Sequence, residues 1–190
     1  KKQLPQGKFT IGYTGTLGVA NCLDTLIEAA SQLQSQTEIA FVIVGQGKQK
    51  EHLQNRFAQL KLNNVTFIDA IPKVQIQSML AEFDVCYIGL TKDDLFHYGV
   101  SPNKLFDYFC SGKPIIYAID SGEYQPVNDA KAGLQIEPEN IVELVTAVQA
   151  LKNEGHEYLS ELGKNGQTIA QKHYEYSSLA KQLEQVIFKL

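Results

Sequence analysis

The sequence of 190 residues is poor in arginine and has no long apolar run. Arg56 is the single arginine among 17 basic residues, and the formal net charge is -4. Arginine supplies the forked hydrogen-bond donors that most often read phosphates and base edges, so we expect no nucleic-acid partner. The apolar runs Ala40–Val44 and Val85–Leu90 are far shorter than the roughly 18 residues that span a bilayer. Both runs are typical of buried strands.

Cysteines are few, and their spacing does not match a zinc or redox motif. Cys22, Cys86 and Cys110 fall inside apolar segments, which predicts small buried side chains in a reducing compartment. The HExxH and EF-hand patterns and a Ser-His-Asp order are also missing. We therefore expect no metal site, no disulfide framework and no hydrolase triad.

Methionine occurs once, at Met79, so the sequence begins at Lys1 without an initiator residue. The segment Lys1–Lys8 lacks the apolar stretch of a signal peptide, which favours a piece cut from a longer polypeptide. The composition, 44% hydrophobic and 20% charged, is that of an ordinary globular protein. Without an internal linker or low-complexity tract, residues 1–190 are expected to form one domain.

Short apolar runs alternate with helical patterns along the chain. Strands of this length between helices predict right-handed crossovers and a parallel sheet covered on both faces, which is an α/β, Rossmann-like doubly wound fold. Ligands of such folds bind beyond the carboxyl ends of the strands. The expected strands are Phe9–Tyr13, Ile39–Val44, Val65–Ile68, Val85–Leu90, Pro114–Ala118 and Gly133–Ile136. The expected helices are Leu23–Leu33, Leu53–Leu60, Val74–Ala81, Ser101–Gly112, Ile141–Leu151, Glu157–Ala170 and Ser178–Leu190.

The first strand runs into the glycine turn Thr14–Gly18, which has two glycines and two hydroxyls. A turn of this kind lets backbone N–H groups approach a phosphate at the positive end of a helix. The turn lacks the third glycine of a dinucleotide fingerprint, and the chain has no P-loop. On spacing alone, a turn that serves only packing is an equal alternative.

The segment Ser101-Pro102-Asn103-Lys104 is the most informative part of the sequence. A serine N-cap with proline at the first helical position would place free N–H groups, a hydroxyl, an amide and an ammonium together, where an anion would bind. Asp107 follows on the same helical face, where its carboxylate would accept hydrogen bonds from a sugar diol. The alternative is that Ser101 only caps the helix and Asp107 only favours its dipole.

Before that helix, the polar segment Thr91–Val100 is predicted to be a loop. It carries Asp93, Asp94, His97 and Tyr98, which suggests a segment that faces a substrate. Loops of this composition are also often simply solvated.

The segment Tyr98–Ile116 resembles an SPNK-L-F-[ED]-Y sequence followed by a small-Gly-x-Pro turn in bacterial surface-polysaccharide transferases. Supporting matches occur in order at Gly12–Gly18, Leu23-Asp24, Val44–Gly47 and Phe83–Val85. From first strand to last helix, the chain resembles the carboxyl-terminal, donor-binding half of a GT-B glycosyltransferase of group 1, family four.

The resemblance implies transfer, with retention, of a sugar from a UDP- or GDP-linked donor to a polysaccharide or lipid-linked acceptor. The acceptor would be bound by an amino-terminal domain preceding Lys1, so the chain alone is expected to be inactive. The nucleotide-sugar is a substrate, and neither a cofactor nor a metal is expected. Such a protein would be cytoplasmic, with peripheral contact to the inner face of the membrane through the missing half.

The resemblance also implies roles for individual residues, although it assigns no catalytic one. The donor diphosphate would lie against Gly15, Thr16, Gly18, Ser101, Asn103 and Lys104. The ribose would meet Asp107, the base would meet Ala70, Ile71 and Pro72, and His97, Tyr98 and Gly99 would face the sugar. In this architecture the last helix packs against the amino-terminal domain, so Leu183, Val186 and Ile187 are expected to be either exposed or differently packed in this chain.

Several positions depart from the family pattern. Gly99 and Asp107 replace two glutamates eight positions apart, and Thr16 and Asn21 replace an arginine and a lysine of the first glycine loop. Lys104, with Lys48, would have to compensate for the lost charge. Two alternatives stay open, namely a GT-B sugar-nucleotide 2-epimerase and a catalytically dead interaction domain.

Overall fold

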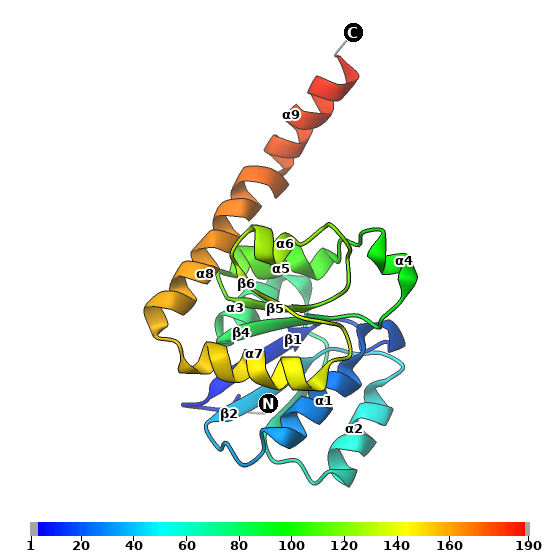
Figure 1. The fold of residues 1–190 in the computed structure, drawn as a ribbon, viewed down its shortest axis with the longest axis vertical. Coiled ribbons are helices and arrows are strands. Elements are labelled where there is room, and N and C mark those ends of the chain that lie inside the picture. Colours follow the sequence, from blue (N-terminus) through cyan, green and yellow to red (C-terminus); the bar gives the residue numbers. More distant parts are fainter. Residues whose placement is uncertain (1–3, 189–190) are drawn as a thin grey trace.

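The computed structural model describes residues 4–188, with the backbone alone at positions 176 and 182. Within this range all the predicted strands form, and they build one wholly parallel, six-stranded sheet in the order β3-β2-β1-β4-β5-β6 (Figure 1). The doubly wound prediction is confirmed. The strands are β1 (Phe9–Thr14), β2 (Ile39–Val44), β3 (Val65–Ile68), β4 (Val85–Gly89), β5 (Ile115–Ala118) and β6 (Gly133–Gln135).

The interior strands β1 and β2 are buried along almost their whole length because helices cover both faces of the sheet, and β2 is apolar throughout. They pair over six positions, from Phe9 opposite Ile39 to Thr14 opposite Val44. The two strands therefore end level with one another. The N–H of Gly15 donates to the carbonyl of Val44 at 3.0 Å, which starts the two glycine turns side by side.

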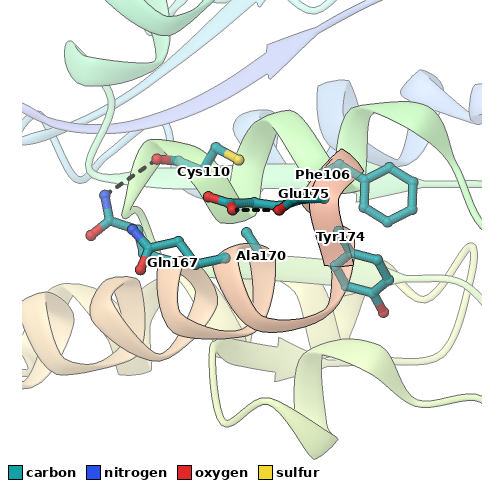
Figure 2. Close-up of a pocket in the computed structure, with 8 residues that line it drawn as sticks. Phe106, Cys110, Gln167, Ala170, Tyr174 and Glu175 are labelled. Atoms are coloured by element: carbon teal, nitrogen blue, oxygen red, sulfur yellow. Dashed lines mark hydrogen bonds between the residues drawn. The ribbon is translucent and has the colours of Figure 1, made fainter. Parts of the chain in front are cut away.

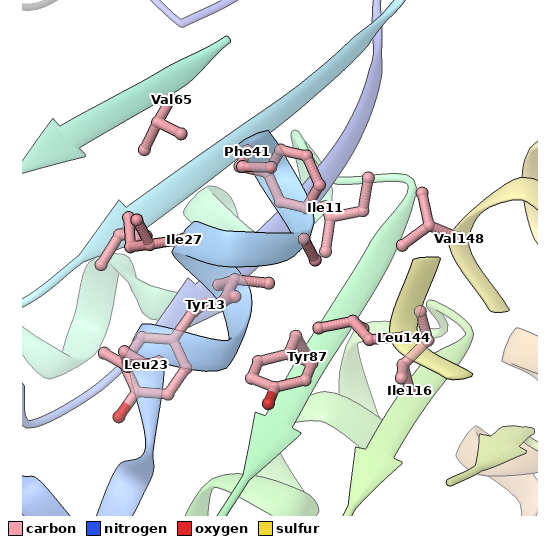
Figure 3. Close-up of a cluster of buried hydrophobic side chains, with 14 of the residues drawn as sticks. Ile11, Tyr13, Leu23, Ile27, Phe41, Val65, Tyr87, Ile116, Leu144 and Val148 are labelled. Carbon is pink, nitrogen blue, oxygen red and sulfur yellow. The ribbon is translucent and has the colours of Figure 1, made fainter. Parts of the chain in front are cut away.

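Helices cover both faces of the sheet, and the strands alternate their side chains between two cores. Ile11, Tyr13 and Tyr87 pack toward the helices on one face, where Figure 3 shows Ile27 and Leu144 against them. On that face lie α1 (Leu23–Gln32), α2 (Lys50–Gln59) and α7 (Ile141–Asn153). The opposite face carries α3 (Ile76–Ala81), α5 (Asn103–Ser111) and α6 (Pro126–Asp129), and α8 (His156–Ile169) packs on α5. Each fully buried large side chain stabilises the fold by about 1.5–3 kcal/mol.

The serine cap predicted for the central helix is wrong by one position. Pro102 is the N-cap residue, its ψ of 129° is extended, and helix α5 begins only at Asn103. No side chain caps this helix, so Ser101 lies outside it. At the other end Gly112 adopts a left-handed φ of 69° and ends the helix, as predicted.

Two four-residue helices were not predicted. Helix α4 (Asp94–His97) lies inside the segment predicted to be a loop, and the Asp93 carboxylate caps it by accepting from the N–H of Leu95 at 2.9 Å. Helix α6 begins at Pro126. Both are too short to show a helical period in the sequence. Short 3-10 turns, η1 (Val19–Asn21) and η2 (Lys73–Gln75), precede α1 and α3.

The cysteines differ in burial, and the prediction that all are buried is wrong. Cys86 is buried in β4, Cys22 is half-buried, and Cys110 is exposed near the end of α5. Apolar neighbours in sequence mislead at Cys110, because its side of the helix faces a surface hollow rather than the sheet. All three thiols are free.

The carboxyl-terminal helices are joined rather than separated. A π-helical turn, η3 (Ala170–Tyr174), connects α8 to α9 (Tyr176–Ile187), and α9 projects from the body (Figure 1). Leu183, Val186 and Ile187 are 59%, 75% and 53% exposed, which confirms that prediction. Positions 189–190 of the predicted last helix lie outside the described residues. Across residues 4–188, none of the helices has both the length and the apolar character that crossing a bilayer requires.

Candidate functional site

The first two glycine turns pack backbone against backbone at the carboxyl ends of β1 and β2. A Cβ atom at Gly45 would stand 1.9 Å from the carbonyl oxygen of Gly15, and one at Gly47 would stand 2.3 Å from that of Leu17. The Leu17 N–H donates to the carbonyl of Gln46 at 3.0 Å. Packing therefore requires the glycines of the second turn, and it fixes the position of the first turn, where a ligand was predicted.

A hollow of about 230 Å³ opens beside these turns. It joins the first glycine turn to the segment after β3, so Gly15 and Thr16 share it with Ala70 and Ile71, as predicted for one ligand. Pro72 is exposed, begins η2, and is not among the residues that line the hollow. The complete lining is Gly15, Thr16, Val44, Gly45, Gln46, Ala70, Ile71 and Ile76.

Lys104 connects helix α5 to the first glycine turn. Its ammonium donates to the Tyr13 hydroxyl at 2.7 Å and to the side-chain oxygen of Asn21 at 2.8 Å. The ammonium also lies 4.2 Å from the centre of the Tyr13 ring and 3.1 Å from the place that a Cβ at Gly15 would take. Residues 13–21 and 104 therefore form one site, although they are far apart in the sequence.

The Lys104 ammonium is held by neutral groups. In the described part of the chain no carboxylate lies within ion-pair distance of it. Burial lowers the pKa of Lys104 from 10.5 to about 7. A bound anion would favour the charged form and raise this pKa again.

Ser101 and Asn103 lie beside this lysine at the exposed start of α5. Neither side chain forms a hydrogen bond with another described residue, so the hydroxyl and the amide are available to a ligand. The first-turn N–H groups of a helix carry partial positive charge, which favours an anion at the same place.

Asp107 lies one turn further along α5, on the side that meets α3. Its backbone carbonyl accepts from the side chain of Gln77 at 3.0 Å, and Ile76, the neighbour of Gln77, lines the hollow. The half-buried Asp107 is therefore close to the helix that borders the hollow. That position is compatible with the predicted contact to a ribose.

Gly18 belongs to a different surface. It lines a smaller hollow of about 150 Å³ with Cys22 and Thr91 and is not part of the lining that Gly15 shares with Ile71. Of the predicted diphosphate residues, only Gly15 and Thr16 line the 230 Å³ hollow, and Ser101, Asn103 and Lys104 line neither of the two.

The predicted sugar-facing residues form a separate group around α4. His97 Nδ1 lies 3.0 Å from a carboxylate oxygen of Asp120, and this hydrogen bond lowers the pKa of Asp120. Tyr98 is 88% exposed. Gly99 has a φ of +105° with open space at its Cβ position. The structure records no contact between these residues and Lys104.

Sequence reasoning missed two tyrosines of the site. Tyr13 in β1 and Tyr108 in α5 are fully buried, and their hydroxyls bond the first glycine turn. Tyr13 donates to the carbonyl of Thr16 at 2.7 Å. Burial raises the pKa of both hydroxyls, so they stay protonated. Their spacing from Lys104 in sequence gave no signal, because the contacts depend on strand order.

A larger hollow, about 530 Å³, lies elsewhere, between α5, α8 and η3 (Figure 2). The rings of Phe106 and Tyr174 are tilted by 58° to one another with centres 4.7 Å apart, and the Gln167 side chain donates to the carbonyl of Cys110 at 3.2 Å. Neither the glycine turns nor Lys104 line it, so it is separate from the predicted donor residues. We therefore place the candidate site at Lys104. The described residues contain no cluster of three or more histidine, cysteine or carboxylate side chains arranged for a metal.

Comparison with known proteins identifies related sequences. The model of the family described as Glycosyl transferases group 1 matches residues 1–169. WcaI of Escherichia coli (strain K12), named for a glycosyl transferase of colanic acid biosynthesis, is 30% identical over 154 residues. The match covers 77% of this chain and 36% of WcaI.

Solved structures share the fold. An S. aureus TarM structure with Fondaparinux, alpha-GlcNAc-glycerol and UDP has a TM-score of 0.76 and 22% identity, over 97% of this chain and 36% of that one. Anabaena HepE with UDP-glucose has a TM-score of 0.77 and 19% identity, over 96% of this chain and 49% of that one. The chain thus spans between about a third and a half of these proteins. At these identities the likeness establishes the Rossmann-like fold of the GT-B glycosyltransferases.

Proposed function

The chain belongs to the group 1 glycosyl transferases, and we propose that residues 1–190 form the donor-binding domain of a retaining enzyme that uses a UDP- or GDP-linked sugar. The observation that carries this proposal is the Lys104 ammonium, which lies half-buried beside Gly15 with neutral partners only. A charge withdrawn from water without a counter-ion is costly. A diphosphate in the adjoining hollow would supply that counter-ion.

The donor would lie across the rim of the sheet. Its diphosphate would sit between the first glycine turn and the start of α5, where Ser101 and Asn103 have free side chains. Its base would reach Ala70 and Ile71, which also border a second hollow of about 420 Å³. We place the ribose at Asp107, because a carboxylate accepts from both hydroxyls of a diol.

In this proposal the site acts on the leaving group. When the bond between the sugar and the diphosphate breaks, negative charge grows on the phosphate oxygen that leaves. Lys104 and the first-turn N–H groups of α5 are fixed before the reaction, so they stabilise this charge without reorganisation. His97, Tyr98 and Gly99 would face the sugar only if α4 approaches the donor in the complete protein. We assign no catalytic base, cofactor or metal.

The acceptor half of the proposal rests on the relative. WcaI is named for colanic acid biosynthesis, which supports a polysaccharide or lipid-linked acceptor for this protein. The acceptor groups would lie on an amino-terminal domain of the same protein, and residues 1–190 alone would be inactive. The enzyme would work in the cytoplasm, with peripheral contact to the inner face of the membrane through that domain.

Isothermal titration with UDP and GDP tests the proposal. At least one nucleotide should bind, and Lys104→Ala should weaken it at least about tenfold, a loss of about 1.4 kcal/mol. The matched control is Lys152→Ala, because Lys152 pairs with Glu38 at 2.6 Å next to the amino end of β2. No binding of either nucleotide, or equal loss in both variants, would contradict the proposal.

A second measurement separates the transferase from the 2-epimerase and from an inactive interaction domain. The full-length protein should release nucleoside diphosphate in step with the formation of a glycosidic bond. Release of nucleotide with an epimerised free sugar, or no turnover of any nucleotide-sugar, would favour the respective alternative.

A further inference from the structure

Among the described residues, Asn21 accepts the one hydrogen bond from the Lys104 ammonium that leads outside strand β1. Its side-chain oxygen accepts from the ammonium at 2.8 Å, and the Tyr13 hydroxyl accepts from it at 2.7 Å. An ammonium has three N–H donors. Two are used, so the third is free for a ligand beside Gly15.

The Tyr13 contact has a fixed direction. The Tyr13 hydroxyl donates its one proton to the carbonyl of Thr16 at 2.7 Å, so its oxygen acts only as an acceptor for Lys104. The ammonium also lies over the ring of the same tyrosine, 4.2 Å from the ring centre. Tyr13 and Asn21 therefore contact the ammonium from two directions and together fix its position.

The backbone holds Asn21 firmly. The 3-10 turn η1 closes with the Asn21 N–H donating to the carbonyl of Gly18 at 3.1 Å. The next residue, Cys22, has a left-handed φ of 46°, which is uncommon for a residue other than glycine and turns the chain into α1. The Thr91 N–H also donates to the carbonyl of Ala20 at 3.0 Å, which ties η1 to the end of β4.

We propose that Asn21 is a positioning residue for the donor: its side-chain oxygen, with the Tyr13 hydroxyl, fixes the Lys104 ammonium beside Gly15 so that the third N–H stays available to the diphosphate. This inference rests on the proposed function. Asn21 does not need to touch the nucleotide itself. Its neutral amide orients the lysine without cancelling the charge that the diphosphate needs, which a carboxylate at the same position would do.

The phenols and the thiol around Lys104 stay neutral near pH 7, because burial raises their pKa. They belong to Tyr13 on β1, Tyr87 on β4, Tyr108 on α5 and Cys22 before α1.

Among the described residues, no carboxylate forms an ion pair with Lys104. Asp24 on α1 pairs with His52 at 2.7 Å, and Glu139 meets the Cys22 thiol at 3.5 Å. A variant that changes only position 21 should therefore act on Lys104 directly.

The first test needs no nucleotide. The pKa of Lys104 is followed by the chemical shift of its carbon next to the ammonium in the wild type, Asn21→Asp and Asn21→Ala. In the wild type Lys104 should titrate with a pKa of about 7. Asn21→Asp should titrate at least about one unit higher, because a carboxylate stabilises the ammonium, and Asn21→Ala should titrate lower.

The second test is the pH profile of UDP affinity from pH 6 to 9. Wild-type affinity should fall above pH 7, because binding then requires uptake of a proton. Asn21→Asp should bind about tenfold more weakly at pH 6, because its carboxylate repels the phosphate, and its affinity should begin to fall at least about one pH unit later than that of the wild type. Asn165→Ala, which loses a hydrogen bond from α8 to the carbonyl of Lys131 at 2.9 Å, should match the wild type.

The outcomes separate this inference from the proposed function. The positioning role would be overturned if the Lys104 pKa were the same in the wild type and both Asn21 variants. It would also be overturned if the Asn21 variants lost the same fraction of UDP affinity at every pH. If the pKa responds but the wild type binds neither UDP nor GDP, the positioning of Lys104 stands and its use for a donor is wrong. Asn21→Asp has the shape of the native residue, so it decides the matter even if Asn21→Ala does not fold.

Discussion

The Tyr108 hydroxyl accepts a hydrogen bond of 2.8 Å from the backbone N–H of Thr14, which lies 94 positions earlier in the sequence. It also lies 3.3 Å from the carbonyl oxygen of the same residue. Both polar groups are buried at the end of β1, where no water replaces a lost partner. This contact ties α5 to the strand that carries the first glycine turn, and Lys104 extends from the preceding helical turn toward Gly15.

Tyr108→Phe should destabilise the fold, because it leaves the N–H of Thr14 without its partner. The expected loss is about 1–3 kcal/mol of unfolding free energy, measured by urea denaturation. Tyr158→Phe is the control, since Tyr158 is exposed on α8. Equal stability of the two variants would mean that the contact contributes nothing.

Lys104→Met should change how stability depends on pH. The pKa of Lys104 is lowered to about 7 in the folded chain, from 10.5 in a free lysine. Between these values the unfolded chain binds the extra proton, so wild-type stability rises with pH through this window and the gain is absent below pH 7. The methionine variant lacks this term.

The difference in unfolding free energy between wild type and Lys104→Met should therefore grow in favour of the wild type from pH 7 to 10. The slope reaches at most about 1.4 kcal/mol per pH unit. Parallel curves for the two proteins would show that Lys104 is not held in the way described. The control is Lys152→Met, whose lysine forms an exposed ion pair.

Gly45→Ala should disturb the first glycine turn without touching its sequence. The new methyl group would stand 1.9 Å from the carbonyl oxygen of Gly15, so one backbone must move. We expect a loss of about 1–3 kcal/mol in thermal unfolding and weaker UDP binding. Gly155→Ala, where the structure leaves open space, should cost less than about 1 kcal/mol. If the Gly45→Ala protein bound UDP with native affinity, the packing between the two glycine turns would not matter for nucleotide binding.

Asp107→Ala should act on the ribose and not on the phosphates. UDP affinity should fall about tenfold, as expected for lost hydrogen bonds to a charged group, whereas affinity for pyrophosphate should be unchanged. Competition titration with both ligands measures this. Equal loss for both would assign Asp107 to the diphosphate or to the shape of α5.

The apolar residues of α9 should contribute little to the stability of this chain. Leu183→Ser and Val186→Ser should each change the unfolding free energy by less than about 0.5 kcal/mol, because both side chains are exposed. Leu144→Ala in α7, which empties a fully buried position, should cost about 2–5 kcal/mol. A large loss from the α9 variants would show that this helix packs on the body in solution.

The fold could be predicted from the sequence because the sheet is covered on both faces. A central parallel strand such as β2 is apolar throughout, so its bounds Ile39–Val44 were predicted without error. Gly112 marked the end of α5, since a left-handed residue there favours glycine. The start of α5 was placed wrongly, because proline is compatible both with the N-cap and with the first helical position.

The site was only partly predictable. Gly15, Ala70 and Ile71 follow β1 and β3, and parallel strands place such segments on one rim whatever their order. The partners of Lys104 depend on side-chain length and strand order, so Tyr13 was overlooked and Asn21 was noted only as a departure. Tyr98 is 88% exposed at the end of α4, and its contact with a sugar stays a prediction.

The strand order also gives the chain a direction of assembly during synthesis. The first three strands, with α1 and α2, form a contiguous half-sheet in which both glycine turns are already in place. Lys104 is synthesised 36 residues after the end of β3, so the anion site stays uncharged until the second half folds onto β1. A nascent chain halted before α5 would contain the two glycine turns without the Lys104 ammonium.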